Sequence, residues 1–181
     1  MNVATMMVNA LAQSGVKRIY GLIGDSLNAI GDAVRLNKRI QWIPVRHEES
    51  AAFAAGAEAF LTGTLTVCAG TCGPGSLHLL NGLYEAARNE SPVLALVTHI
   101  PVSEIGTEYF QETNPATVFK DCSVFCETVM SAEQMPRLLQ SAMQAALAQK
   151  GVAVLIVPSD VAKAEVPVEQ TVYCRTVDNK P

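Results

Sequence analysis

Residues 45–60, VRHEESAAFAAGAEAF, place two carboxylates beside a histidine where a short apolar run gives way to an alanine-rich stretch. A carboxylate at a helix N-terminus is often there because the helix dipole favours negative charge, and this explanation suffices for Glu49. Glu48 comes closer to the preceding strand, and His47 could orient it. A carboxyl buried there can hold a proton and act as a hydrogen-bond donor or general acid. The residues alone leave two roles open for Glu48, a solvated helix cap or a functional group in a cleft.

Two glycine-containing segments could approach a ligand. Residues 70–76, GTCGPGS, have the backbone freedom for a close approach, but they lack the GK[ST] ending of a phosphate loop and the GxGxxG spacing of a dinucleotide site. Pro74 also removes one amide donor. This segment could equally be a tight turn with nothing bound. In residues 24–26, GDS, Asp25 or Ser26 could simply cap the helix that follows.

The other histidines and the cysteines give weaker signals. We expect His78 and His99 to be structural, and Cys72 lacks a GxSxG elbow and an evident base. Four of the five cysteines form CxxxC pairs, which differ from the CxxC spacing of zinc ribbons, and no HxxxH accompanies them. We therefore expect free thiols and no metal-binding residue in this chain. The pairs are Cys68 with Cys72 and Cys122 with Cys126.

Composition excludes several classes of protein. The 181 residues are 49% hydrophobic and 17% charged, which is typical of a globular domain with a buried core. The formal net charge is −4 and no basic block is present, so nucleic acid is not an expected partner. The N-terminal residues lack the basic and apolar regions of a signal peptide, and no apolar run is long enough to span a bilayer. We expect a cytoplasmic protein.

The elements that must position these residues alternate between strand and helix. Short apolar runs bounded by Gly, Pro or charge predict strands at residues 18–23, 41–45, 65–70, 93–98, 123–129 and 152–157. Helical spacing of apolar residues predicts helices at residues 5–16, 26–36, 76–89 and 131–151, the first ending at Gly15 and the last opening with a Ser131 cap and closing on Gly151. Apolar strands that alternate with helices indicate an α/β fold, a doubly wound, mostly parallel sheet of about six strands with helices on both faces.

In such sheets ligands bind at the carboxyl ends of the strands. The four unusual segments, residues 24–26, 46–49, 70–76 and 98–112, all follow predicted strands. After Pro158 the periodic pattern stops. We expect residues 1–160 to form one domain and residues 161–181 to be a linker or tail, with the chain being one part of a longer protein.

Taken together, these segments resemble the pyrimidine-binding (PYR) domain of thiamine-diphosphate enzymes. The resemblance covers residues 3 to 161 and rests on GVKRIYGLIGDSLNAIGDAV, VRHEESAAFAAGAEAFLTG, CAGTCGPGSLHLLNGLYEAARNESPVLAL and HIPVSEIGTEYFQETNP. Acetolactate synthases share the HE, GPG and FQE elements. The GDSLN stretch resembles the corresponding segment in one branch of the family, that of pyruvate oxidase and quinone-dependent pyruvate dehydrogenase.

The resemblance implies a role for the segment that opens with Glu48. In this family the matching Glu contacts N1′ of the aminopyrimidine ring and promotes removal of the C2 proton of the cofactor, which then attacks pyruvate. The alanine-rich helix after it would lie near a subunit interface of a homodimer or tetramer. The resemblance also implies that Gly24, Asp25, Ser26, Gly73, Pro74, Gly75 and Asn81 contact the cofactor, and that Phe110 and Gln111 face the substrate.

The chain departs from the family pattern in one respect. The family binds Mg²⁺ through a GDG motif and a downstream Asn in a separate domain, and neither GD dipeptide of this chain is followed by Gly. The resemblance implies that Mg²⁺ and FAD bind through other domains, so that these 181 residues alone are inactive. It also implies that electrons pass to oxygen or to a membrane quinone, with possible peripheral membrane contact. The alternatives are the PYR domain of an acetolactate synthase-like enzyme and a non-catalytic binding or dimerisation module.

Overall fold

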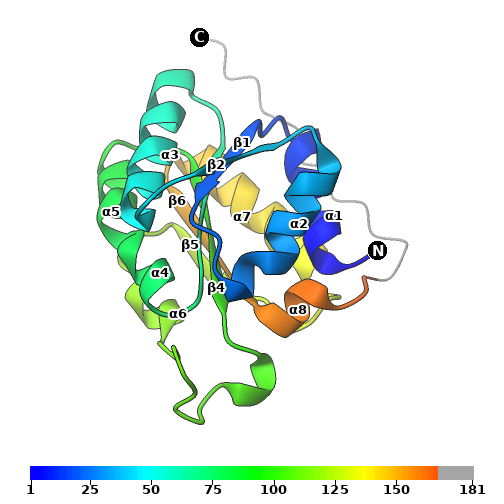
Figure 1. Ribbon diagram of the computed structural model, residues 1–181. Coiled ribbons are helices and arrows are strands. Elements are labelled where there is room, and N and C mark those ends of the chain that lie inside the picture. The colour runs from blue at the N-terminus through cyan, green and yellow to red at the C-terminus, as the bar shows by residue number, and fades with distance from the viewer. Residues whose placement is uncertain (167–181) are drawn as a thin grey trace.

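The computed structural model describes residues 1–166, which form a six-stranded sheet covered on both faces by helices (Figure 1). Every pair of neighbouring strands is parallel, and the strand order is β2-β1-β3-β4-β6-β5. The strands are β1 (Arg18–Gly21), β2 (Gln41–Pro44), β3 (Thr66–Gly70), β4 (Val93–His99), β5 (Phe125–Thr128) and β6 (Val152–Pro158). The prediction of a doubly wound α/β fold is therefore confirmed.

The helices divide into two layers. One face of the sheet is covered by α1 (Val3–Gln13), α2 (Asn28–Asn37), α7 (Met135–Gln149) and α8 (Ser159–Lys163). The other is covered by α3 (Glu48–Thr62), α4 (Pro74–His78), α5 (Leu80–Arg88) and α6 (Pro115–Val118). Two short 3-10 helices, η1 (Asp25–Leu27) and η2 (Val102–Glu104), follow β1 and β4. Two separate clusters of buried apolar side chains result, one on each face.

The central strands are buried on both faces. Every residue of β3, β4 and β6 is buried, which explains why these strands are continuous apolar runs and do not alternate. The outer strands β2 and β5 have only exposed and half-buried residues. The core therefore lies around the middle of the sheet.

The small side chains of α3 allow it to pack closely against α5. A β-carbon on Gly82 would lie 2.6 Å from the β-carbon of Ala52, and one on Gly56 would lie 3.2 Å from that of Ala86. Only residues without a larger side chain permit this separation of two helices. The alanine-rich composition of α3 thus has a structural reason within the described chain.

Two of the predicted helices differ notably from the structure. The helix expected at 76–89 is two helices, because the Leu79 amide bonds the carbonyl of Ser76, three residues earlier, at 3.1 Å and tightens the turn. Ser131 does not cap α7, which begins at Met135 with Pro136 in its first turn. Pro is favoured there because it needs no amide partner.

Regular structure continues beyond β6. Helix α8 packs Val161 and Ala162 into the core, and Glu165 forms an isolated antiparallel bridge with Asn2. Residues 161–166, where we expected a linker or tail to begin, therefore pack against the rest of the described chain. The rest of the predicted linker or tail, residues 167–181, lies outside the described residues.

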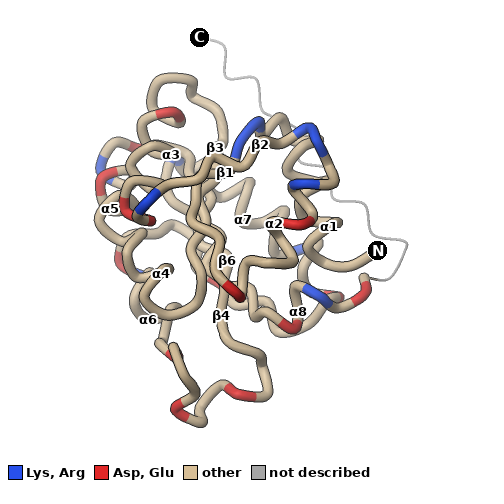
Figure 2. The backbone as a smooth tube through the Cα atoms, viewed as in Figure 1, with Lys and Arg blue, Asp and Glu red and all other residues tan. Residues whose placement is uncertain are grey.

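Charge is unevenly distributed over the fold (Figure 2). The loop that follows β4, at the bottom of the view, carries Glu104, Glu108 and Glu112 and no Lys or Arg. Within residues 1–166, no helix has both the length and the apolar character needed to cross a membrane.

Candidate active site

The strand order reverses direction between β1 and β3, and we call the carboxyl edge of the sheet around this point the crevice. From β1 the chain moves to β2 at one edge, and from β3 it moves to β4 in the opposite direction. These two strands therefore flank the point where the strand order reverses, and doubly wound proteins bind ligands at the carboxyl ends of such strands. The GDS and GTCGPGS segments follow β1 and β3 respectively, so the structure brings these two predicted segments together.

Ser26 connects the loops around this crevice. Its side chain is 5% exposed, and its Oγ lies 2.7 Å from the Thr71 Oγ1 and 2.6 Å from the Thr98 Oγ1. The Cys72 amide donates to the same oxygen at 2.9 Å. These contacts join the segments that follow β1 and β3 to the last residues of β4. The hydroxyl of Ser26 therefore holds these loops together through its hydrogen bonds.

The rest of the GDS segment lies closer to solvent. A β-carbon on Gly24 would lie 2.6 Å from the Thr71 Oγ1, so only glycine lets these loops approach each other so closely. Asp25 is exposed and accepts from the Asn28 side chain at 3.2 Å. Neither Asp25 nor Ser26 caps the backbone of α2, whose cap residue is Leu27. The interpretation of this segment as a simple helix cap is wrong.

Glu48 is the first residue of α3 and is almost completely buried, at 4% exposure. Its Oε2 lies 3.0 Å from the Nδ1 of His78 in α4. Its Oε1 faces Gly75, where an added β-carbon would lie only 2.9 Å away. Within residues 1–166 no side chain or amide bonds Oε1, so one oxygen of this carboxyl is held and the other is open to a ligand.

His47 and Glu49 have separate roles beside Glu48. His47 caps α3, its Nδ1 accepting from the Glu49 amide at 3.3 Å, and it forms no hydrogen bond to Glu48. The Glu49 carboxylate accepts from the side chain of Asn81 in α5 at 2.6 Å. Asn81, which the resemblance assigns to the cofactor, thus links α5 to the start of α3.

His47, Glu48 and His78 offer ligand atoms within 4.8 Å of one another, a set that can in principle bind a transition metal. The two imidazoles, however, stack with ring centroids 4.3 Å apart and planes inclined by 26°. Imidazoles that share a metal must both point edge-on at it, since the lone pair lies in the ring plane. Nearly parallel stacked rings do not converge in this way, and we assign no metal to this cluster.

The glycine loop lies next to the loop that follows β4. Gly73 has a positive φ of 70°, and a β-carbon there would lie 2.8 Å from the β-carbon of Gln111. Gln111 itself has φ 64°, and its Oε1 accepts a weak hydrogen bond from the Cys72 thiol at 3.7 Å. Pro74 occupies the first turn of α4, where a missing amide costs nothing. The fold thus places Gln111 at the crevice, with its neighbour Phe110 80% exposed.

The acidic loop after β4 is organised by Glu112. Its carboxylate accepts from the amides of Gly106 at 2.6 Å and Tyr109 at 3.1 Å. The hydrogen bond from Gly106 is the main reason why the pKa of Glu112 lies below its ordinary value. His99, at the end of β4, is buried, and this burial lowers its pKa. The two hydrogen bonds to Glu112 stabilise the loop that carries Phe110 and Gln111.

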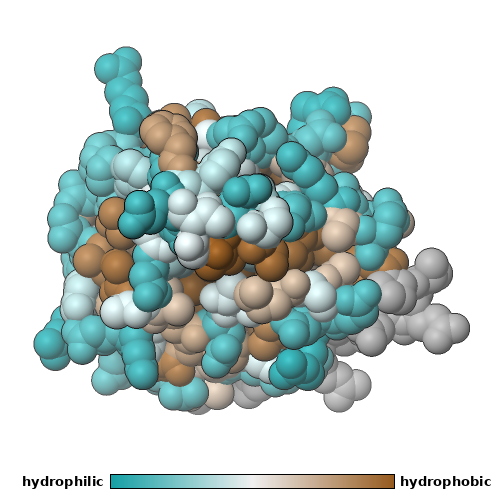
Figure 3. All heavy atoms as spheres, turned by 90° about the horizontal axis from the view of Figure 1, so that it is seen from below, coloured by the Kyte–Doolittle hydropathy of each residue, from teal (hydrophilic) through white to brown (hydrophobic). Residues whose placement is uncertain are grey.

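The carboxyl edge of the sheet exposes apolar side chains. Figure 3 views the molecule from below and shows an apolar band between polar groups on this face. Ile105, Tyr109 and Phe110 of the loop after β4, and Leu22 and Ile23 of the loop after β1, are among the exposed apolar residues of the described chain. A ligand in the crevice would therefore meet apolar contacts as well as Glu48.

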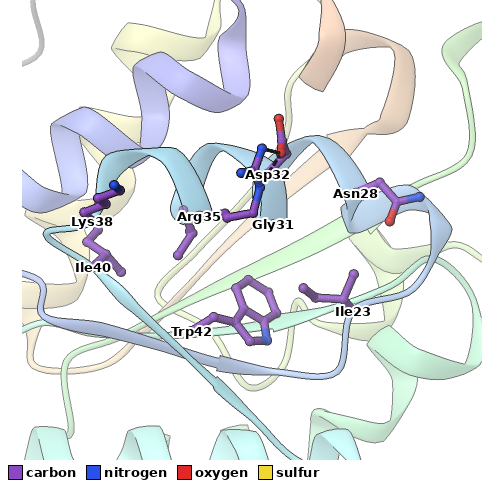
Figure 4. Close-up of a pocket in the computed structure, with 9 residues that line it drawn as sticks. Ile23, Asn28, Gly31, Asp32, Arg35, Lys38, Ile40 and Trp42 are labelled. Atoms are coloured by element: carbon purple, nitrogen blue, oxygen red, sulfur yellow. Dashed lines mark hydrogen bonds and ion pairs between the residues drawn. The ribbon is translucent and has the colours of Figure 1, made fainter.

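A separate hollow lies between α2 and β2 (Figure 4). Trp42 forms its floor, and Arg35, ion-paired with Asp32 at 2.7 Å, lies on its rim. The Trp42 indole N–H donates to the Gly21 carbonyl, so no buried polar group is free to orient a ligand there. This hollow is open and does not include Glu48. We place the candidate site at the crevice, because a cavity without convergent polar groups lacks the chemistry.

The sequence did not indicate the contact between His78 and Glu48, and we expected His78 to be a structural residue. It lies 30 residues after Glu48, and no local pattern connects the two. The signal that could have found it is the topology, because a parallel sheet brings the segment after β2 and the segment after β3 to the same edge.

Comparison with known proteins agrees with this geometry. Residues 1–118 match the family of thiamine pyrophosphate enzymes, N-terminal TPP binding domain. The chain is 59% identical over 163 residues, 90% of its length, to an uncharacterized 42.6 kDa protein of Pseudomonas amyloderamosa, covering 41% of that protein. It is 39% identical to pyruvate oxidase of Lactiplantibacillus plantarum, with 90% of this chain and 27% of the oxidase covered. It is 32% identical to the large subunit of acetolactate synthase isozyme 2 of Escherichia coli, with 99% of this chain and 32% of that subunit covered.

The chain thus spans between about a quarter and two fifths of the length of these relatives. The matched residues include β1, β3, Glu48, His78 and the glycine loop, that is, the crevice and the groups that line it. The chain belongs to the thiamine pyrophosphate enzyme family and carries its N-terminal, cofactor-binding domain.

Proposed function

We propose that this domain binds the aminopyrimidine ring of thiamine diphosphate through Glu48, in a protein that oxidatively decarboxylates pyruvate. The observation that carries the proposal is the division of the Glu48 carboxyl into one oxygen held by His78 and one open oxygen facing Gly75. A nearly buried carboxyl with a free oxygen is suited to share a proton with a ring nitrogen.

The residues around Glu48 fit a flat heteroaromatic ring. Gly75 leaves free the space in front of Oε1 that any side chain would fill. Gly73 and Pro74 shape the same loop, and the apolar edge at Phe110 can contact a ring face.

We assign Gly24, Asp25 and Ser26 to the opposite wall of the crevice, with Ser26 acting through the loops that it holds. The direct cofactor contact predicted for Asn81 stays a prediction, since its amide binds Glu49.

Thiamine diphosphate, when bound, supplies the nucleophilic carbon and the electron sink for decarboxylation of a 2-oxo acid. The protein contributes the position of the ring and a matched proton at Oε1 of Glu48. Burial keeps water away from this oxygen and so strengthens its hydrogen bond to a ligand. Gln111, held against Gly73, is the residue that we place on the substrate side together with Phe110.

The choice of pyruvate and of oxidation rests on the similarity to a pyruvate oxidase at 39% identity. The proposal for the whole protein includes Mg²⁺ and FAD bound by other segments, a homo-oligomer, a cytoplasmic location and possible peripheral contact with a membrane. An acetolactate synthase-like activity is the second candidate, favoured by 32% identity over 99% of this chain. Pyruvate-dependent reduction of flavin or a quinone distinguishes the first from formation of acetolactate.

The experiment that tests the proposal compares two adjacent carboxylates in the full-length protein. Glu48→Gln should lower carbon dioxide release from pyruvate by about 10²–10⁴-fold, since an amide cannot share a proton with a ring nitrogen. Glu49→Gln, the matched control, removes a charge that binds Asn81 and should have a far smaller effect. Equal activity of the two variants would refute the assignment of Glu48.

A further inference from the structure

We propose that His78 positions Glu48 and carries protons between solvent and this buried carboxyl. The inference rests on the proposed function of Glu48 and concerns a residue to which that function gives no role. Three observations support it: the 3.0 Å contact of His78 Nδ1 with Glu48 Oε2, the difference in exposure of the two side chains, and the open state of Oε1.

The difference in exposure between Glu48 and His78 indicates the path that a proton takes between the carboxyl and solvent. The Glu48 side chain is 6% exposed, whereas that of His78 is 45% exposed. A proton that enters or leaves Glu48 once a ligand covers Oε1 must therefore pass by way of Oε2. On that side the described chain presents the imidazole of His78, which has one nitrogen on the carboxyl and a second nitrogen for solvent.

Imidazole can transfer a proton without a net change in its own charge. Its Nε2 takes a proton from water while its Nδ1–H gives one to Oε2 of Glu48, and Glu48 gives its proton from Oε1 to the ligand. The ring changes only its tautomer, and the reverse transfer restores it. Proton number is conserved at each step, and no oxidant or further reactant is needed.

Other groups near His78 are already engaged. His47 stacks on its ring but uses Nδ1 as the cap of α3, and Glu49 is held by Asn81. Within residues 1–166, neither forms a hydrogen bond or an ion pair with the Glu48 carboxyl. His47→Asn is the matched control, because Asn is a good N-cap and leaves the contact of His78 with Glu48 in place.

The first test needs no cofactor. Nitrogen-15 NMR of histidine-labelled protein at pH 8 should find His78 as the Nδ1–H tautomer, because Oε2 accepts from that nitrogen. Glu48→Ala should shift His78 toward the Nε2–H tautomer, whereas His47→Asn should not. A wild-type His78 in the Nε2–H form would overturn the proposal.

The second test measures exchange of the C2 proton of bound thiamine diphosphate with deuterium in the full-length protein. His78→Asn keeps a donor near Oε2 but cannot relay, so exchange should fall by about 10- to 100-fold while cofactor affinity changes little. In His78→Ala the rate of exchange should fall further. Added imidazole should restore exchange in this variant, because the cavity left by the histidine can accept it. It should not restore exchange in His78→Asn, whose side chain fills that space.

The outcomes separate the two proposals. If Glu48→Gln abolishes exchange and His78→Asn exchanges like the wild type, the relay is refuted and the role of Glu48 stands. If Glu48→Gln itself exchanges like the wild type, the proposed function fails. A loss in His78→Ala that imidazole does not rescue would leave His78 with a purely structural role and would refute the relay.

Discussion

The hydroxyl oxygens of Ser26 and Thr98, 72 residues apart in the chain, lie 2.6 Å from each other in the interior of the protein. Thr98 also donates to the Gly70 carbonyl at 3.1 Å, so the hydrogen bonds continue from the loop after β1 through β4 to the end of β3. Buried hydroxyls of this kind stabilise a structure only when all are satisfied. The position of the crevice walls therefore depends on a small polar network.

Ser26→Ala should loosen this network. The variant leaves the buried Cys72 amide without its acceptor, and a lost buried partner costs about 1–3 kcal/mol. We expect a loss of stability of this size in urea unfolding, together with weaker binding of thiamine diphosphate. Thr64→Ala, which removes an exposed hydroxyl bond between Thr62 and Thr64, is the control and should change stability by less than about 0.5 kcal/mol. Equal stabilities of the two variants would contradict this role of Ser26.

Gly75→Ala should obstruct the open oxygen of Glu48. The new methyl group would lie 2.9 Å from Oε1 and 2.6 Å from the Thr71 methyl, so one of them must move. We expect at least about a tenfold loss of affinity for thiamine diphosphate, equivalent to about 1.4 kcal/mol, by calorimetric titration of the full-length protein. Gly31→Ala is the control, because its methyl meets only the flexible end of Ile23. Unchanged affinity in Gly75→Ala would mean that the ligand does not approach Oε1 from this side.

Leu61→Glu should weaken self-association. Leu61 and Phe60, near the end of α3, are 82% and 63% exposed, an unusual density of large apolar side chains. We expect the wild type to be a dimer or larger in light scattering. The dissociation constant of the variant should be at least about tenfold higher, because an unpaired carboxylate is costly to bury. Leu36→Glu, on α2 and 59% exposed, is the control on the opposite face of the sheet. A monomeric wild type at high micromolar concentration would argue against the interface.

Cys68 should make the fold sensitive to alkaline pH. Burial raises its pKa from 9.0 to about 12, so above pH 9 the unfolded chain loses a proton that the native state retains. Raising the pH therefore favours unfolding, and one such thiol contributes up to about 1.4 kcal/mol per pH unit between those two values. Cys68→Ala should show a shallower decline of unfolding free energy from pH 9 to pH 11 than the wild type. Parallel declines would show that this thiol is not buried as described.

The sequence alone was enough to predict the class of fold. The short, continuous apolar runs of β3, β4 and β6, bounded by Gly, Pro or charge, are typical of strands buried on both faces, which helices must cover. Residue type was also enough to single out the segments after the strands, including Glu48, as candidates, whereas the role expected of Glu48 came from the resemblance to a family. These features follow from periodicity and residue type, which are properties of neighbouring residues in the chain.

The tertiary structure alone decided which side chains meet. The pairing of Glu48 with His78, the contacts of Ser26 with Thr71 and Thr98, and the contact of Gly73 with Gln111 join separate loops. It also decided that Glu49 binds Asn81 and that α8 belongs to the core. Such contacts depend on strand order and on the direction in which each chain segment leaves the sheet, and no local pattern encodes these, because many orders of six parallel strands bury the same apolar residues equally well.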